Sequence, residues 1–330
     1  MSKLLYPILL FSAALFTGCT DDVYVAGWKD YGKRGRIAQI WRNGVSRNLT
    51  DRKTNDAVAV SVYVSDNDVY VAGYDITSFW SVAKLWKNGT AENLTGESNF
   101  VEALSVHVFG NDVYIAGRER NVAKLWKNGV AKNLSDETYS ASAFSVYVSG
   151  NDVYVAGREQ DTQQSNHVAK IWKNGTVQSL TDGNHSASAQ SVYISDNDVY
   201  VAGYEDNAQE SHVAKLWKNG VAQSLTDGNY NAKANSVYMS GNDVYVAGYE
   251  YNAKRKSVAK LWKNGTAQDL SDGTAEAEAY SVYVAGNNVY VAGIERNAEG
   301  IYVAKLWKNG VAKNLSDGQK DAMAFSVFVK

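Results

Sequence analysis

The sequence has few of the residues that build crosslinked or metal-bound scaffolds. Its 330 residues include one cysteine, one proline and four histidines. A single cysteine excludes a disulfide framework within the chain, and so few Cys and His residues argue against a zinc cluster. An excess of one charge is also lacking, because 33 basic and 35 acidic residues give a net charge of −2. This balance excludes a globally basic nucleic-acid-binding protein. We expect no metal, no cofactor and no nucleic-acid partner.

Long hydrophobic runs are also absent, apart from one at the start of the chain. Lys3 precedes an apolar run from Leu4 to Phe16, and small residues follow. A run of this length is too short to span a bilayer comfortably as a helix. A positive charge, a short apolar core and small residues are typical of an export signal. Residues 1–18 are therefore predicted to be a signal peptide.

The only cysteine follows this segment at once, in Leu15-Phe16-Thr17-Gly18-Cys19. The motif resembles the lipobox of bacterial lipoproteins, which implies that Cys19 is lipidated and anchors the mature chain to a membrane. Thr20 stands where Asp would favour retention in the inner membrane. The resemblance therefore implies the cell envelope, at the outer membrane, on its periplasmic side or at the cell surface. An ordinary signal peptide with an incidental cysteine is the alternative.

Residues 19–330 consist of one repeated unit. A motif Asp/Asn-Val-Tyr-Val/Ile-Ala-Gly recurs every 40–46 residues, starting at 22, 68, 112, 152, 198, 243 and 288. A second motif, Trp-Lys/Arg-Asn-Gly, follows each copy. Periods of this length indicate a solenoid or a propeller. The chain is predicted to form a single domain of seven repeats.

The pattern within each repeat favours a propeller. Val- and Tyr-rich segments alternate with period two, as strands do, and no segment has the spacing of an amphipathic helix. Asn-Gly supplies the positive φ angles of tight hairpin turns. Each unit therefore contains four antiparallel strands, the content of one blade. The sequence predicts an all-β, seven-bladed β-propeller.

The two ends of the chain predict how the ring closes. Residues 23–26 match a second strand of the repeat, and residues 326–329 match a first strand. If the C-terminal strand pairs into the first blade, it supplies the inner strand that this blade lacks. Closure also removes the exposed edges of an open array.

The repeat is similar to a WD40-type blade in the stretch Ser-Val-Tyr-Val-Ser-Gly-Asn-Asp-Val-Tyr-Val-Ala-Gly, found at Ser145–Gly157, and in the Lys-Leu-Trp that follows this stretch in most repeats. The likeness covers essentially the whole mature chain. Each Trp is followed by Lys or Arg where the family has Asp, and no Gly-His pair precedes the inner strand. Alanine at 72, 156 and 202 replaces the family's serine, so its internal hydrogen-bond network is expected to be absent.

The repeated aromatic residues are predicted to be structural. The seven motif tryptophans should pack between blades. His107 occupies the position that Tyr63 and Tyr147 hold in neighbouring repeats, so we interpret it as a substitute in an aromatic stack and not as a general base.

Two faces of the propeller are expected to differ. The tight turns are short and nearly identical, whereas the loops on the opposite face vary, and variable loops on a rigid scaffold commonly bind ligands. On this loop face an acid follows Ala-Gly in six repeats, often beside an aromatic residue or arginine. The candidate ligand-binding residues are Trp28, Tyr74, Asp75, Arg118, Glu119, Arg158, Glu159, Tyr204, Glu205, Tyr249, Glu250 and Glu295. Phe144, Tyr280 and Phe325 are expected at the mouth of the central channel.

Cys19 lies close to the first tight turn, so a lipid there would hold the tight-turn face against the bilayer. A ring of Lys or Arg after the tryptophans would then approach anionic headgroups. The ring comprises Arg42, Lys87, Lys127, Lys173, Lys218, Lys263 and Lys308.

These features predict a membrane-anchored, non-catalytic binding protein of the envelope, acting as a monomer. Aromatic rings beside carboxylates suit glycans, and similar blades suit a repetitive ligand bound multivalently. A protein-interaction scaffold of the envelope is the alternative. A glycosidase with two carboxylates is the third reading, which the equivalent spacing of the acids disfavours.

Overall fold

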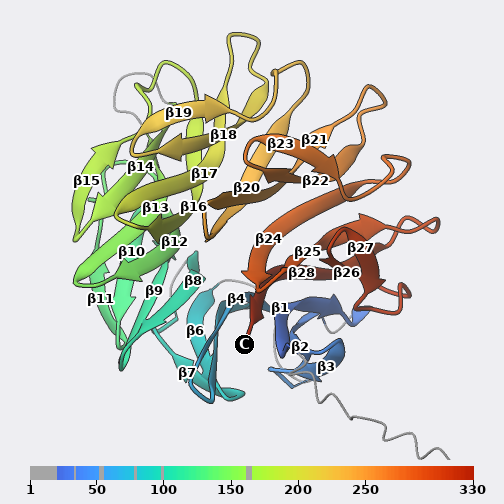
Figure 1. Ribbon diagram of the computed structural model, residues 1–330. Helices are drawn as coiled ribbons and strands as arrows, with labels where there is room; N and C mark the ends of the chain where they lie inside the picture. Colours follow the sequence, from blue (N-terminus) through green and yellow to red (C-terminus); the bar gives the residue numbers. More distant parts are fainter. Residues whose placement is uncertain (1–20, 33–34, 52–55, 78–79, 98–99, 161–165) are drawn as a thin grey trace, which may run out of the picture.

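The computed structural model describes residues 21–330 except 33–34, 52–55, 78–79, 98–99 and 161–165. Its strands form seven four-stranded antiparallel sheets, arranged as blades of one ring (Figure 1). This arrangement confirms the predicted all-β, seven-bladed propeller. The predicted signal peptide and Cys19 lie outside the described residues.

Each blade contains an inner, a second, a third and an outer strand. The inner strands are β4 (Asp56–Ser65), β8 (Val101–Phe109), β12 (Ala141–Ser149), β16 (Ala187–Ser195), β20 (Ala232–Ser240), β24 (Ala277–Ala285) and β28 (Ala322–Val329). The second strands are β1 (Val23–Asp30), β5 (Asp68–Ile76), β9 (Asp112–Glu119), β13 (Asp152–Gln160), β17 (Asp198–Asp206), β21 (Asp243–Tyr251) and β25 (Asn288–Arg296). The third strands are β2 (Arg36–Arg42), β6 (Ser81–Lys87), β10 (Val122–Lys127), β14 (His167–Lys173), β18 (His212–Lys218), β22 (Ser257–Lys263) and β26 (Tyr302–Lys308). The outer strands are β3 (Val45–Asn48), β7 (Thr90–Asn93), β11 (Val130–Asn133), β15 (Thr176–Ser179), β19 (Val221–Ser224), β23 (Thr266–Asp269) and β27 (Val311–Asn314).

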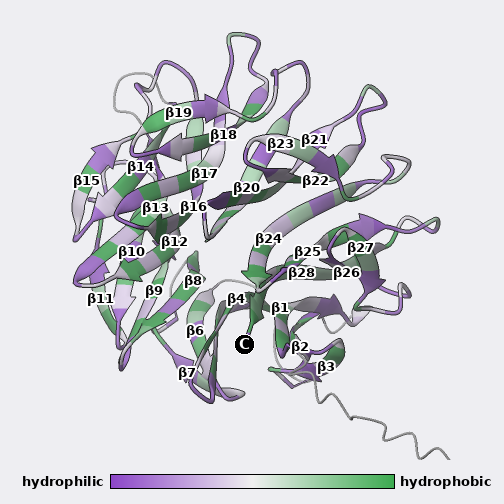
Figure 2. Cartoon of the chain, in the orientation of Figure 1, coloured by the Kyte–Doolittle hydropathy of each residue, from purple (hydrophilic) through white to green (hydrophobic). Residues whose placement is uncertain are grey.

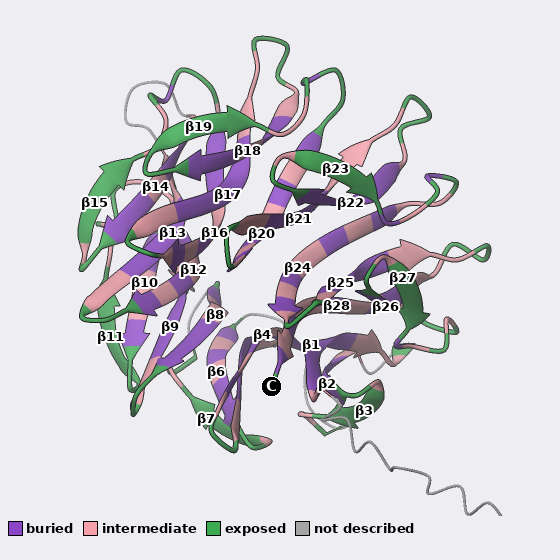
Figure 3. Ribbon diagram, in the orientation of Figure 1, coloured by how far each residue is buried: buried purple, intermediate pink, exposed green. Residues whose placement is uncertain are grey.

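The blades are numbered from the N-terminus. Blade 1 contains β28, β1, β2 and β3, and blades 2 to 7 each take four consecutive strands, from β4–β7 to β24–β27. Hydrophobic and hydrophilic residues alternate along the strands, as Figure 2 shows. The outer strands are exposed along their whole length, whereas the inner three strands of each blade carry the buried residues (Figure 3).

The ring closes through the C-terminal strand, as predicted. β28 pairs antiparallel with β1, which places Val329 opposite Val23 and Val327 opposite Val25. The backbone N–H groups of Asp22 and Lys330 each donate to the carbonyl of the other residue at 3.0 Å. Asp22 and the C-terminal residue therefore meet on the tight-turn face, where other blades have a hairpin turn.

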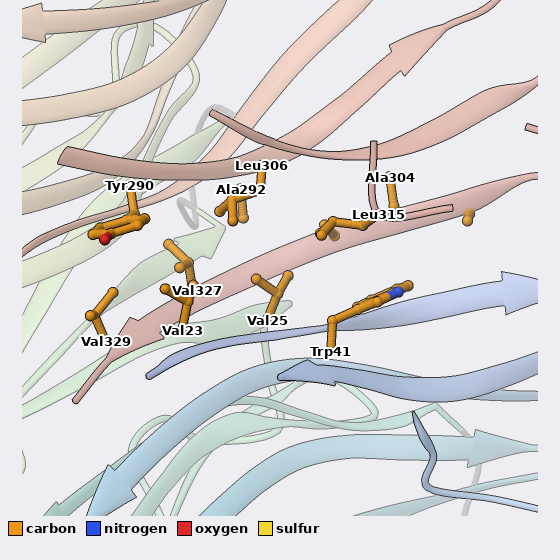
Figure 4. Packing of buried hydrophobic residues seen from close by; sticks show 12 residues of the cluster. Val23, Val25, Trp41, Tyr290, Ala292, Ala304, Leu306, Leu315, Val327 and Val329 are labelled. Carbon is orange, nitrogen blue, oxygen red and sulfur yellow. The ribbon is translucent and has the colours of Figure 1, made fainter. Parts of the chain in front are cut away.

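The seven motif tryptophans lie between blades, which confirms their predicted structural role. Each is at most 1 % exposed. Trp41 of blade 1, for example, belongs to the same buried cluster as Ala292, Ala304 and Leu306 of blade 7 (Figure 4). Five of the indole N–H groups, those of Trp86, Trp126, Trp217, Trp262 and Trp307, have no hydrogen-bond partner in the described structure.

Each inner strand carries a β-bulge, which explains the glycine of the Ala-Gly motif. In blade 5 the pairing shifts between Ala189 and Ser191. The bulge brings the Ser188 carbonyl toward the second strand, so a Cβ on Gly203 would lie 2.0 Å from that oxygen. Only glycine fits so close a backbone approach. The bulge leaves one residue per blade unpaired at the loop-face end of the inner strand.

The tight turns use the Asn of Asn-Gly as a bridge between strands. In blade 5, Asn219 has φ +50°, its Oδ1 accepts from the Val199 N–H at 2.8 Å, and its Nδ2 donates to Asp198 at 2.7 Å. Lys218 lies 2.7 Å from the same carboxylate and holds the pKa of Asp198 below its usual value.

This pairing recurs around the predicted cationic ring. Six of its seven members contact an Asp of their own blade, at 2.6–2.7 Å, which is the first residue of the second strand or, in blade 1, the residue before it. These members are Arg42, Lys87, Lys127, Lys173, Lys218 and Lys263. Blade 7 has Asn288 in place of the Asp. The ring therefore carries little net positive charge.

Two closed rings of contacts surround the axis. In every blade the serine that directly follows the bulge residue of the inner strand accepts a hydrogen bond from a valine N–H of the next inner strand, at 3.1–3.2 Å. The bond from the Val62 N–H to Ser326 completes the circle. Two residues further on, seven aromatic side chains lie with ring centroids 4.6–4.8 Å apart; they are Tyr63, His107, Tyr147, Tyr193, Tyr238, Tyr283 and Phe328. His107 is one member of this ring, as the sequence predicts.

We expect His107 to make stability depend on pH between about 6.5 and 4. Burial lowers the pKa of this imidazole to about 4. Because the unfolded chain then binds the proton more tightly, stability falls as the pH drops from about 6.5 to about 4, by about 3 kcal/mol at most. Urea unfolding of the parent and of His107→Tyr at pH 7 and pH 4.5 measures the effect. His167, whose pKa burial also lowers, contributes equally to both proteins.

The expected result is a smaller loss of unfolding free energy in His107→Tyr than in the parent on going to pH 4.5. Equal losses in the two proteins would contradict a buried, neutral His107. Tyrosine is the matched replacement because five other blades carry it at this position.

Candidate functional site

The second strands end on the loop face, and their last residues carry most of the predicted site. Successive side chains of a strand point to opposite faces of the sheet. In blade 5, Tyr204 therefore lies on the sheet face that packs against blade 6, whereas Glu205 lies on the other face. The aromatic or arginine residue and the acid that follows it do not share one surface.

The six predicted acids all form ion pairs with a lysine of the third strand in their own blade. The N–O distances are 2.9 Å for Asp75–Lys84, 3.0 Å for Glu119–Lys124, 3.5 Å for Glu159–Lys170, 3.3 Å for Glu205–Lys215, 3.1 Å for Glu250–Lys260 and 2.5 Å for Glu295–Lys305. The lysine side chains are only 14–17 % exposed. These partly buried pairs link two strands of a blade.

The lysine partners of these acids were not predicted from the sequence, although a sequence pattern indicates them. Lysine stands two residues before the motif tryptophan in blades 2 to 7. In blade 1 that position is Gln39, and the acid position is Lys29. The two positions change together. Lys29 instead pairs with Asp317 of blade 7 at 2.8 Å.

The aromatic members of the predicted site are largely covered by the next blade. Trp28 and Tyr204 are 8 % and 7 % exposed, and Tyr74 and Tyr249 are half-buried. Burial raises the pKa of Tyr74 to about 12, with Glu102 of the next blade adding to the rise. Arg118 is paired with Glu102 at 2.7 Å. Whether these residues bind a ligand stays a prediction.

Phe144, Tyr280 and Phe325, the predicted mouth residues, are the unpaired residues of the inner-strand bulges. The rings of Tyr280 and Phe325, from adjacent blades, lie 5.4 Å apart. In the neighbouring blade, Asn235 at the same position donates to the Ala279 carbonyl at 2.9 Å. The bulges therefore bring side chains of different blades together, next to the axis. Their identities vary around the ring.

A polar cluster at the ends of blades 4 to 7 breaks the repeat. Lys233 lies with its Nζ 4.7 Å from the centre of the Tyr204 ring. Glu278 accepts a hydrogen bond from the Tyr280 hydroxyl at 3.0 Å. Burial raises the pKa of Glu278 and lowers that of Lys233, and each group partly offsets the shift of the other. Arg158 lies beside Tyr204, and its guanidinium is 5.6 Å from the Phe144 ring.

Lys233 and Glu278 were not predicted. They occupy one repeat position, two residues before the bulge, where the seven blades carry Val, Glu, Ser, Ser, Lys, Glu and Met. Such variation at a single position of a regular repeat is the signal that would have identified them.

Other features of the described residues are less specific. No group of three or more His, Cys, Asp or Glu side chains is placed to hold a metal ion there. The same residues contain no helix that is long and apolar enough to cross a membrane. On the tight-turn face, a groove of about 730 Å³ runs between blades 1 and 2, beside Tyr24, Ile40, Val45 and Val69.

Comparisons with known proteins support the fold alone. No family model and no curated protein matches the chain. Among solved structures, it is similar to a puromycin-hydrolyzing peptidase from Mycobacterium tuberculosis, with a TM-score of 0.57 and 10 % sequence identity. The match covers 89 % of this chain but 54 % of the peptidase, so the chain spans about half of that protein's length.

Proposed function

We propose that the protein is a non-catalytic binding protein of the cell envelope that takes a glycan at the loop-face mouth of its channel. The observation that carries this proposal is the polar and aromatic cluster of Arg158, Tyr204, Lys233, Glu278 and Tyr280. Aromatic rings beside charged hydrogen-bonding groups are suited to sugars, whose ring faces are apolar and whose edges are hydroxyls. The cluster lies where adjacent blades converge and where the repeat is broken.

A non-catalytic role is supported by the pairing of the predicted acids. A glycosidase uses two carboxylates about 5–10 Å apart across the scissile bond. Each of the six acids after Ala-Gly instead pairs with a partly buried lysine. An acid in such a pair is oriented within its blade by its lysine, which suits a structural role.

Anchoring through a lipid on Cys19 is the second part of the proposal, and it implies the outer membrane. The chain enters the described residues at Asp21, next to the tight-turn face, so a lipid at Cys19 would lie within about 10 Å of that face. Val45, Val130, Val221 and Val311 are each 73 % exposed at the tight turns before the outer strands. Six cations of this face are paired with aspartates. Contact of the exposed valines with the bilayer therefore supports the approach of the tight-turn face to the membrane better than attraction of its cations to lipid headgroups does.

A glycan array with the chain from residue 20 onward tests the proposal, because all seven blades lie within residues 22–330. We expect reproducible binding to one class of sugar, competed by free sugar and weakened at least tenfold in Tyr249→Ala. Tyr249 adjoins the cluster, since Glu278 and Tyr204 help to raise its pKa. The matched control is Tyr200→Ala, in a neighbouring blade but at its tight-turn end. No binding on the array would reject the glycan and leave a protein partner at the loop face, to be sought by crosslinking.

A further inference from the structure

Arg158 and Lys233 stand out among the partly buried cations of this protein. Among the described residues, nine lysines and four arginines are intermediate in burial. Eight of these lysines have a carboxylate oxygen within 4 Å; they are Lys29, Lys84, Lys124, Lys170, Lys215, Lys256, Lys260 and Lys305. Three of these arginines, Arg36, Arg118 and Arg296, also have one. Among these thirteen partly buried cations of the described residues, Lys233 and Arg158 have no carboxylate oxygen within 4 Å.

The two unpaired cations lie against the same side chain. Lys233, from blade 6, lies over the Tyr204 ring. Arg158, from blade 4, is near the Tyr204 hydroxyl and partly offsets the rise in its pKa that burial causes. They are close enough that Arg158 helps to lower the pKa of Lys233, although burial is the larger cause. Two positively charged side chains, both half-buried, therefore lie near each other.

The nearby acids are engaged elsewhere. Asp206 contacts Nδ1 of His212, whose ring packs on Tyr204 at 4.4 Å. Glu278 accepts from Tyr280. Both acids act on Lys233 from beyond ion-pair distance and only partly offset the effect of burial on its pKa. Removing a cation from water is costly unless an anion is in contact with it.

We propose that an anionic group of the ligand binds between Arg158 and Lys233, against Tyr204. This inference rests on the proposed function, since it makes the glycan an acidic one. A planar guanidinium and an ammonium on either side of a phenol offer charge-assisted hydrogen bonds to a carboxylate or to a sulfate ester. Uronic acids and sulfated sugars are the two sources of this chemistry.

Isothermal titration with glucuronate, glucose 6-sulfate and glucose tests the site. We expect at least tenfold tighter binding of one or both acidic sugars than of glucose, a preference that falls as salt is added. Glucuronate alone identifies a carboxylate site, and the sulfate ester alone a sulfate site. In the double variant Arg158→Met and Lys233→Met, the preference should disappear. The control double variant, Lys254→Met and Arg255→Met, removes the same charge from an exposed loop of the same face and should retain it.

The outcomes separate this inference from the proposed function. Equal affinity for glucose and the acidic sugars would overturn the anion site and leave a neutral-glycan protein. Binding of inorganic sulfate that the Arg158/Lys233 double variant abolishes, together with a blank glycan array, would retain the site and reject the glycan. Thermal unfolding supplies a folding control. Because both cations are unpaired, their double variant should unfold no earlier than the parent, and a clearly lower Tm would give them a structural role and overturn the inference.

Discussion

A chain that ends at Asp321 is expected to lose most of its stability and to associate through the exposed edge of β1. The deletion removes β28, whose Val327 and Val329 are each 4 % exposed. Two buried valines are worth about 3–6 kcal/mol together, against about 5–15 kcal/mol for a whole domain. The deletion also opens the serine and aromatic rings around the axis. Urea unfolding and size-exclusion chromatography measure the two effects.

A permuted chain is the matched control for this deletion. Residues 322–330 placed before residue 21, through a short turn, restore β28 next to β1, because Lys330 and Asp22 already exchange backbone hydrogen bonds. We expect this permutant to unfold near the parent's midpoint as a monomer. A truncated chain as stable as the permutant would show that β28 contributes little, contrary to its burial.

Replacement of one motif tryptophan is expected to be the most damaging single substitution. Trp217 is 1 % exposed and packs in a cluster with Tyr154, Ala156, Ala169 and Ile171 of the preceding blade. Trp217→Ala leaves a cavity between two blades, and such a change costs about 3–5 kcal/mol. The free energy of urea unfolding measures it.

Trp80 provides the comparison, since it lies in a loop and is 41 % exposed. Trp80→Ala should change the unfolding free energy by less than about 1 kcal/mol. Similar losses in the two variants would mean that the motif tryptophans do not hold the blades together.

The fold was predictable because the same information occurs seven times. Period-two alternation, Asn-Gly turns and the Ala-Gly motif recur in each repeat, and the matching ends specify how the ring closes. His107 could be placed in its aromatic ring for the same reason: six other repeats show what its position holds.

The candidate site was less predictable because it depends on side-chain direction and on the bulge. Tyr204 and Glu205 are neighbours in sequence but lie on opposite faces of β17. Grouping them as one surface overlooked the alternation of side chains along a strand. The bulge at each inner strand determines which residues approach the axis. The variation at its repeat position could have identified Lys233 in the sequence, but the structure was needed to show that no carboxylate oxygen lies within ion-pair distance of it.

The acid–lysine pairs of blades 2 to 7 bear on how such a chain evolves. Each pair closes within its own blade, and each join between blades uses the same tryptophan, serine and aromatic contacts. A blade duplicated or exchanged by recombination therefore brings its own charge balance and fits its new neighbours. Loops and bulge residues are then free to diverge one blade at a time, and an uncompensated pair such as Arg158 and Lys233 can arise by local substitution without disturbing the ring.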